Sequence, residues 1–488
     1  MVQGMSETLA LAADFPHRTR ADWEAAARKA LKDRPLEDLT WSTWDGVDLK
    51  PLYSADDEVA PVFAPRGAGP DPARAWDLRA RVDAATPVEA NAQALAELDG
   101  GAASLLVVLD RAAERGVAMA DAGGMARTLD GVVLELAGVA LDAGFAGASA
   151  AEWLGEAAKG SPRARLAFHL DPIGALAVEG RSPGPLAAHL ARAAETAARL
   201  TEPYPEASLF LASGVAVHEA GGSKAQELGF MAACAVAYAK AADAAGLAPA
   251  QAFPRVALGL SVDGEYLCSL AKLRAARLIW ARLTQACGVE APARIEARAS
   301  RRGLSRMDPW SNLLRLGASA FAGAVGGADA VVLEPFTRPL GEADAFARRQ
   351  ARNAQLVLMD EAGLGRVDDP AAGSWFLDAL TAELAEAGWG VFREIETRGG
   401  VAAALESGWL QRQVADVAER RRADLAEGRA QMIGVTRFAD PDGRKPSVVD
   451  TTRGPAAELD VSLAGADDAC EPLTPIRLAE PWETETAA

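Results

Sequence analysis

The sequence is poor in the residue types that most often carry out chemistry. Aromatic residues make up 6% of its 488 positions, and it contains 4 histidines and 4 cysteines. The cysteines are widely scattered, without a C-x-x-C pair, which argues against a disulfide framework and fits a reducing compartment. H-E-x-x-H, G-x-S-x-G and paired Cys/His zinc patterns are absent, so the sequence predicts neither a metal site nor a self-sufficient hydrolase.

Long apolar runs and an excess of positive charge are also missing. No window reaches about 18 uninterrupted apolar residues, and the N-terminus lacks a basic region followed by an apolar run. The net charge of −18 argues against nucleic acid as a partner, because binding to phosphates needs clustered Lys and Arg. These absences predict a cytoplasmic protein that binds neither nucleic acid nor a membrane.

Half of the residues are hydrophobic, and short apolar runs alternate with helix-patterned segments. About eight such β-like runs followed by helices predict an α/β fold of the (β/α)8 TIM-barrel type, with an open doubly wound sheet as the competing arrangement. The runs cover residues 76–83, 103–110, 137–144, 163–172, 206–217, 254–264, 293–300 and 329–336.

The remaining segments predict extensions on both sides of the barrel. We expect an N-terminal arm over residues 1–70, the barrel over 71–365, two amphipathic C-terminal helices within 366–435, and an extended, linker-like tail over 436–488.

The arm combines a helical pattern from Ala21 with two short strands around the Asp45-Gly46 turn. It has too little apolar surface to fold alone. Its aromatic residues, Trp23, Trp41, Trp44 and Tyr53, are therefore predicted to lie against another surface, either this barrel or a partner subunit.

One long motif carries a family resemblance. Residues 352–400 contain an ARN-x-Q element, an acidic residue followed by Gly, a DP-x-x-GS element and an E-x-E-x-x-GG ending. This order resembles the closing segment of the barrel in the adenosylcobalamin-dependent methylmalonyl-CoA mutase family. The matching residues are Arg352, Asn353, Gln355, Glu361, Asp369, Pro370, Gly373, Ser374, Glu394, Glu396, Gly399 and Gly400.

Other phrases, such as DGVDLKPLY from Asp45 and VGGADAVVLEPFTRPLG from Val325, resemble the small (beta, non-catalytic) subunits of that family. The resemblance implies that this chain lacks the cobalamin-binding domain and pairs with a large catalytic subunit in a heterodimer. That partner would hold adenosylcobalamin and isomerise methylmalonyl-CoA and succinyl-CoA, while this chain would stabilise it.

The sequence departs from the family pattern where the cofactor would bind. Cobalamin-carrying members hold the cobalt through the histidine of a D-x-H-x-x-G motif. The histidines here, His17, His169, His189 and His218, have no aspartate two positions before them. The resemblance therefore implies no cofactor bound by this chain.

The catalytic motif is also altered. Residues 213–222 read SGVAVHEAGG where catalytic members have a stretch close to S-G-Y-H-x-Q-E-A-G-A, so Val215 and Ala216 occupy the Tyr-His positions. Neither side chain can donate a hydrogen bond. We expect no catalytic residue, although Glu219, His218 and His169 are candidates for cofactor contacts. A structural or interface role is the favoured interpretation of His218, and a subunit contact is an equal alternative for His169.

A basic cluster and a helix motif complete the set of candidates. Arg298, Arg301 and Arg302 lie close together in the sequence and are candidates for binding a CoA phosphate, against the commoner role of solvated or subunit-bridging arginines. The stretch AKLRAAR from Ala271 matches the family, and its charged residues are predicted to form salt bridges on a helix surface.

Two further functions stay open. The chain could be an autonomous mutase barrel that uses a separate B12-binding subunit, although the missing Tyr and His disfavour this. It could also be a non-enzymatic scaffold for a GTPase chaperone that loads cobalamin.

Overall fold

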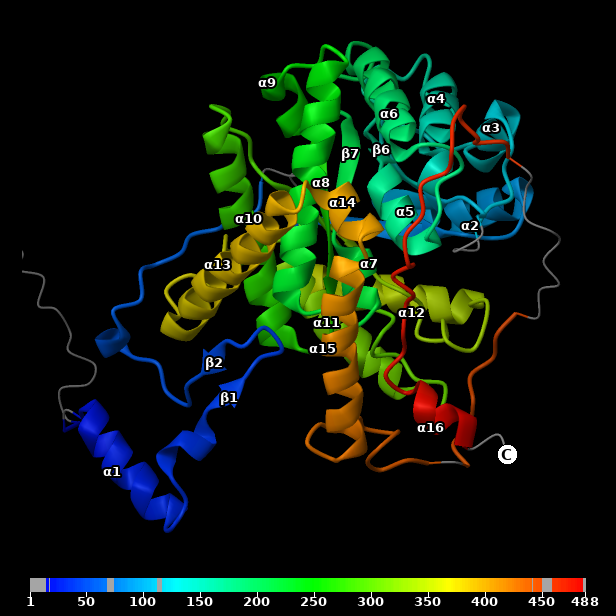
Figure 1. Ribbon diagram of the computed structural model, residues 1–488. Helices are drawn as coiled ribbons and strands as arrows, with labels where there is room; N and C mark the ends of the chain where they lie inside the picture. The colour runs from blue at the N-terminus through cyan, green and yellow to red at the C-terminus, as the bar shows by residue number, and fades with distance from the viewer. Residues whose placement is uncertain are drawn as a thin grey trace, which may run out of the picture.

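Eight parallel strands close a barrel at the centre of the molecule (Figure 1). The computed structural model describes residues 15–16, 18–67, 74–111, 116–440, 442–449 and 459–485. The strand order around the barrel is β10-β3-β4-β5-β6-β7-β8-β9. This confirms the predicted TIM barrel, and the open doubly wound sheet is wrong. The strands are β3 (Asp77–Val82), β4 (Ser104–Val108), β5 (Gly138–Asp142), β6 (Leu166–Leu170), β7 (Ser208–Ser213), β8 (Val256–Val262), β9 (Arg294–Ala299) and β10 (Ala330–Val332).

Helices follow the strands and pack on the outside of the barrel. They are α2 (Pro87–Asp99), α3 (Ala122–Thr128), α4 (Gly147–Ala157), α5 (Pro172–Glu179), α6 (Leu186–Thr201), α7 (Val215–Glu219), α8 (Lys224–Ala244), α9 (Pro249–Ala252), α10 (Tyr266–Ala286), α11 (Ser311–Val325) and α12 (Ala345–Leu356). No helix among the described residues is both long enough and apolar enough to cross a membrane.

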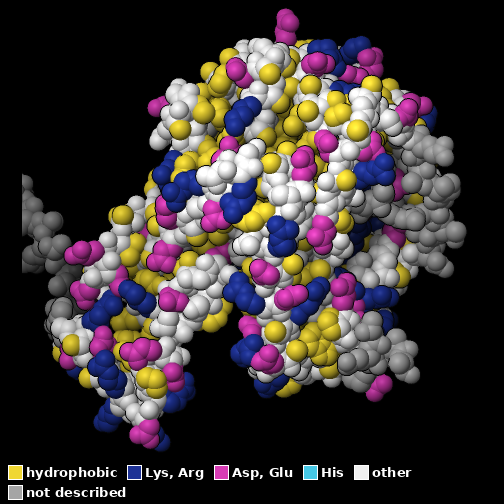
Figure 2. Space-filling view, in the orientation of Figure 1, with side chains coloured by type: hydrophobic (Ala, Val, Ile, Leu, Met, Phe, Trp, Pro, Cys, Tyr) yellow, Lys and Arg dark blue, Asp and Glu magenta, His cyan; other side chains and the backbone are white. Residues whose placement is uncertain are grey.

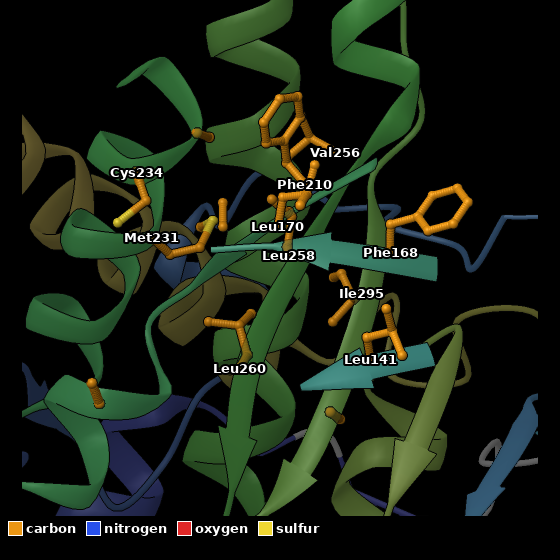
Figure 3. Close-up of a cluster of buried hydrophobic side chains, with 14 of the residues drawn as sticks. Leu141, Phe168, Leu170, Phe210, Met231, Cys234, Val256, Leu258, Leu260 and Ile295 are labelled. Carbon is orange, nitrogen blue, oxygen red and sulfur yellow. The ribbon is translucent and has the colours of Figure 1, made fainter. Parts of the chain in front are cut away.

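The main hydrophobic core lies between the strands and these helices. Figure 3 shows side chains from several strands in this layer, among them Leu141, Phe168, Leu258 and Ile295. Because successive residues of a strand point to opposite sides, the neighbours of these residues point into the barrel. The residues that face the inside are therefore a separate set, and many of them are charged.

The N-terminal arm has two parts. Helix α1 (Arg20–Leu31) begins with a capping box between Thr19 and Asp22, and none of its described residues is buried. It stands away from the barrel (Figures 1 and 2). Strands β1 (Trp41–Ser42) and β2 (Asp48–Leu49) form the predicted hairpin, and the chain then runs along the barrel, where Val62 and Ala64 are buried.

The aromatic residues of the arm also fall into two groups, those that pack on this chain and those that stay exposed. The Trp44 indole N–H donates to Glu265 at 3.0 Å, and its ring lies 4.6 Å from the Arg421 guanidinium. Tyr53 packs on Phe376, with ring centroids 5.2 Å apart. Trp41 is 51% exposed. The part of the arm from Trp44 onwards therefore packs on this chain, whereas α1 and Trp41 leave apolar surface uncovered.

Three helices, rather than the two predicted, follow the barrel. They are α13 (Trp375–Thr397), α14 (Val401–Glu406) and α15 (Trp409–Ala426). The short α14 is separated from its neighbours by Gly400 and Gly408, which both have positive φ, and the sequence pattern did not separate it. Near the end of the described chain, α16 (Glu480–Glu485) lies beside the barrel mouth (Figure 1).

A buried arginine joins the arm, the barrel and the C-terminal helices. Arg274 of α10 pairs with both oxygens of Asp369 at 3.0 Å and with Asp378 at 2.9 Å. It also donates to the Val62 carbonyl at 2.7 Å, while Asp369 accepts the Ala64 N–H at 2.8 Å. The AKLRAAR stretch thus forms salt bridges as predicted, but Arg274 is fully buried and not on the helix surface.

Replacing Arg274 should therefore destabilise the whole chain. We expect Arg274→Met to lower the free energy of unfolding by about 3–5 kcal/mol, because two buried carboxylates lose their partner. Urea denaturation measures this difference. The control is Arg282→Met on the same helix, whose partner Glu386 is 3.5 Å away and mostly exposed, so its loss should cost no more than about 1 kcal/mol. Equal losses in the two variants would contradict this role of Arg274.

Candidate functional site

A cavity of about 460 Å³ lies at the carboxyl ends of the barrel strands. In TIM-barrel proteins this end carries the functional site. The cavity is lined by residues at or just after several strands, including Asp142 of β5, His169 of β6, Ser213 of β7 and Arg298 of β9. We call it the mouth cavity.

The inside of the barrel is charged because charged residues alternate with apolar ones along two strands. In β3, Asp77, Arg79 and the following Arg81 alternate with buried apolar residues, and β9 repeats the pattern with Glu296 and Arg298. The period of two places these side chains on the inner face of the barrel. This alternation was a usable signal for Arg81 and Glu296, which were not among the candidates predicted from the sequence.

These side chains form a chain of ion pairs across the barrel. Arg79 pairs with Asp77 at 2.7 Å and with Glu296 at 2.5 Å. Arg298 pairs with the other oxygen of Glu296 at 2.7 Å and with Asp142 at 2.7 Å. Since β9 and β5 are opposite each other in the strand order, the Arg298–Asp142 pair spans the interior from wall to wall.

Neighbouring arginines keep the carboxylates of this network ionised. Burial by itself raises the pKa of Glu296, but the Arg298 guanidinium opposes it, with His169 and Arg79, and the pKa falls to about 2. Burial also opposes ionisation of Asp142, yet Arg111 and Arg298 bring its pKa well below the usual value. Both carboxylates are therefore ionised at neutral pH, and the arginines between them are neutralised.

His169 lies in the interior of the barrel, beside Glu296 and Arg79, and its role at a subunit contact stays a prediction. It is 5% exposed and has a positive φ of 48°. Its Nδ1 makes no hydrogen bond to any described atom. Burial lowers the pKa of His169 to about 4, so the imidazole is neutral at pH 7. It borders both the mouth cavity and a cavity of about 490 Å³ at the opposite end of the barrel.

The two positions that correspond to the family's Tyr-His pair face the mouth cavity. Val215 and Ala216 begin α7 and line the cavity wall with apolar groups. His218 lies on this helix, not on a strand, and it does not line the cavity. Its Nδ1 lies 3.2 Å from Glu227 and its Nε2 3.5 Å from Asp263. It does not replace the missing catalytic histidine.

Burial and the Arg302 charge lower the pKa of His218 to about 3. The imidazole is therefore neutral at pH 7 and lies between two buried carboxylates. The sequence favoured a structural or interface role for His218, and the contacts that the structure describes lie within this chain.

Two carboxyl groups of the mouth cavity are harder to ionise. Burial raises the pKa of Asp171 to about 6, although the Tyr238 hydroxyl and the Gly174 N–H both donate to it. Burial also raises the pKa of Glu219, whose carboxylate accepts the Arg301 N–H at 3.2 Å. Glu219 lines the mouth cavity, where a residue that contacts a cofactor would lie. Its carboxylate, however, already accepts a hydrogen bond from the backbone of the barrel.

The predicted arginine cluster is divided by the fold. Arg298 and Arg301 line the mouth cavity, whereas Arg302 is 2% exposed and turned away from it. Arg302 pairs with Asp263 at 3.0 Å and donates to the His218 carbonyl at 2.8 Å. The three arginine side chains therefore do not form one basic surface. The charge of Arg298 is paired with Glu296 and Asp142 inside the barrel.

The C-terminal segment covers part of the mouth. The N–H groups of Leu473, Ile476 and Leu478 donate to the carbonyls of Ala177, Glu219 and Arg302 at 2.7, 2.9 and 2.9 Å. Pro475, Ile476 and Arg477 complete the cavity wall. Arg477 is held by two 2.7 Å bonds to Glu483 of α16. The cavity is thus closed partly by residues far from the barrel in sequence.

The described residues do not fit a cobalamin cofactor. His218 is enclosed by carboxylates, and His169 is buried within the barrel beside Arg79 and Glu296. His189 bonds to the Pro183 carbonyl at 3.1 Å, and His17 lies outside the described residues. In the part of the chain that the structure describes, no group of His, Cys, Asp and Glu has a metal-binding arrangement.

The closed strand order and the strand-end cavity define a TIM-barrel protein. Comparison with known proteins identifies a family within this class. A sequence model described as methylmalonyl-CoA mutase matches residues 43–459. The chain therefore belongs to the methylmalonyl-CoA mutase family.

Several relatives bear the name small subunit. The methylmalonyl-CoA mutase small subunit of Streptomyces virginiae is 39% identical over 88% of this chain and 72% of its own length. The small subunit of Propionibacterium freudenreichii subsp. shermanii is 31% identical over 94% and 74%. A methylmalonyl-CoA mutase of Rhizobium meliloti is 29% identical over 86% of this chain and 64% of its own length.

The depressed pKa of Glu296 predicts how the barrel responds to acid. The carboxylate's contribution is fully present above its ordinary pKa of 4.5 and is lost as the pH falls through about 2. Glu296→Gln should therefore lower the free energy of unfolding by about 3 kcal/mol at pH 7, and the difference from wild type should shrink steadily below pH 4.5.

Denaturant unfolding at several pH values measures this difference. Glu206→Gln, at an exposed position near the opposite end of the barrel, is the control and should stay within about 0.5 kcal/mol of wild type throughout. A Glu296→Gln difference that is constant from pH 7 to pH 3 would show that the ion pair does not stabilise the barrel.

Proposed function

We propose that this chain is the small, non-catalytic subunit of an adenosylcobalamin-dependent methylmalonyl-CoA mutase. It pairs with a large catalytic subunit in the cytoplasm and stabilises it. The large subunit binds the cofactor and interconverts methylmalonyl-CoA and succinyl-CoA. The relatives named small subunits support the pairing, because that name implies a larger partner.

The observation that carries the non-catalytic role is the state of the barrel interior. Arg298 and Asp142 line the mouth cavity and bridge opposite strands, and each charge is neutralised by its partner. Catalysis needs donors aimed at charge that develops in the transition state. At the positions where catalytic relatives have Tyr and His, Val215 and Ala216 offer no donor.

This role is tested by turnover of methylmalonyl-CoA in the presence of adenosylcobalamin. The chain alone should give none, and neither should Val215→Tyr/Ala216→His, because catalytic groups that act as a unit fail together. The large subunit, co-purified from the same host, should give turnover only in its complex with this chain. Turnover by this chain with a separate B12-binding protein would instead support the autonomous mutase, and co-purification with a GTPase but no mutase chain would support the scaffold.

The uncovered part of the arm is the surface we propose for the large subunit. Trp23 is half-buried on a helix with no buried residue, and Trp41 is half-exposed on β1. Trp41 borders a surface pocket with Tyr53, Trp375 and Phe376. Aromatic side chains of this kind carry much of the binding energy at protein interfaces.

The arm can be tested with two matched sets of variants. Trp23→Ala/Trp41→Ala should weaken the heterodimer at least about tenfold while leaving the melting temperature of the isolated chain within about 2 °C of wild type. Trp44→Ala should lower that melting temperature, because Trp44 packs on Glu265 and Arg421. Unchanged affinity in the first variant would contradict the assignment of the arm to the interface.

A further inference from the structure

The C-terminal segment that covers the mouth cavity has two parts, which are attached to the barrel in different ways. The first part, residues 459–473, runs beside the end of α5 and the start of α6. The second part, residues 474–485, crosses the mouth and ends in α16, and Figure 1 shows it in red. We call this second part the mouth lid. It belongs to this chain alone, so the inference does not rest on the proposed function.

The first part is fixed by side chains as well as by its backbone. The Asp467 carboxylate accepts the Gly184 N–H at 2.9 Å, and the Asp468 carboxylate accepts the Leu186 N–H at 2.7 Å. At the end of this part the Leu473 side chain is 2% exposed and belongs to the main hydrophobic core. The first part is therefore anchored along its length.

The mouth lid has fewer buried contacts. Among residues 474–483, all of which the structure describes, only Ala479 is buried, and it lies in a small apolar cluster outside the main core. Backbone bonds from the N–H groups of Ile476 and Leu478 join the lid to the barrel. Segments with little buried apolar surface open locally at a lower free energy than the core does. We therefore expect the lid to open while the first part stays bound.

One carboxylate fastens the lid. Glu483 in α16 is 9% exposed and accepts two 2.7 Å bonds from Arg477, which lines the mouth cavity. The same carboxylate accepts the Arg306 N–H at 2.7 Å, in the loop after β9. Glu483 thus joins the lid both to itself and to the barrel. Since hydrogen bonds to a charged group are roughly twice as strong as neutral ones, these bonds favour the closed position.

We propose that the mouth lid opens and closes the mouth cavity as a unit, and that Glu483 is the latch that holds it closed. In the closed position the lid completes the wall of the cavity that Val215 and Ala216 also line. When the Glu483 carboxylate releases Arg477 and the Arg306 N–H, the lid moves away from the barrel and the first part stays in place. The apolar surface at Val215 and Ala216 is then open to solvent, so the closed lid excludes ligands from the mouth cavity.

Hydrogen exchange of the full chain, measured by mass spectrometry and resolved to single residues, tests this opening. In wild type the N–H groups of Ile476 and Leu478 should exchange together and at least about tenfold faster than that of Leu473, because the lid opens without the core. Glu483→Ala should speed exchange in the lid at least about tenfold further, because its charge-assisted bonds are lost.

The matched control is Glu471→Ala, which removes the same charge from an exposed position of the first part. Its lid should exchange within about twofold of wild type, as expected for a surface substitution. The melting temperatures of both variants should stay within about 2 °C of wild type, which shows that the barrel is folded. The comparison within wild type needs no variant.

Alkylation of Val215→Cys shows whether the mouth opens with the lid. Peptide mapping follows the reaction at this position, so the exposed Cys287 does not interfere. Combined with Glu483→Ala, the new cysteine should react at least about tenfold faster than when it is combined with Glu471→Ala. Lid exchange as slow as that of Leu473 in wild type, equal effects of the two glutamate variants, or faster exchange without faster alkylation overturns the proposal.

Discussion

The bond between Arg298 and Asp142 is the constraint around which the barrel interior is organised. It joins β9 to β5 across the full width of the barrel, and both side chains are mostly buried, at 16% and 15% exposed. A buried charge that loses its partner costs several kcal/mol, so every charged neighbour must be placed to neutralise the next. Glu296, Arg79 and Arg111 do this. Among the described residues, the interior is consequently a network of paired charges.

A second buried charge connects this barrel to the rest of the chain. Arg274 holds the arm through the Val62 carbonyl and the C-terminal helices through Asp369 and Asp378. The DP-x-x-GS element, which carried the family resemblance, therefore has a structural explanation: its aspartate is the acceptor for Arg274 and for the arm backbone. This agrees with a subunit that keeps the family's architecture while its mouth lacks hydrogen-bond donors at Val215 and Ala216.

The sequence predicted the barrel well because each strand is a short apolar run followed by a helical pattern, and such local periodicity survives folding. Through the family motif it also singled out Val215 and Ala216, which line the mouth cavity. Arg298 lines the mouth cavity and Arg302 is turned away from it, although the two are close in the sequence. The sequence could not separate them, since their positions depend on strand register. Nor could it show that Arg274 is buried, because its partners lie about a hundred residues away and an AKLRAAR pattern is equally suited to a solvent-facing helix.

Turnover by the assembled heterodimer carrying Arg298→Gln in this chain tests most directly whether the mouth cavity has a purely structural role. If the pair only holds the barrel closed, the complex should be less stable to denaturant but retain its kcat and KM for methylmalonyl-CoA within about twofold. A fall of tenfold or more in kcat/KM, with the heterodimer intact, would mean that this barrel takes part in catalysis and would contradict the account.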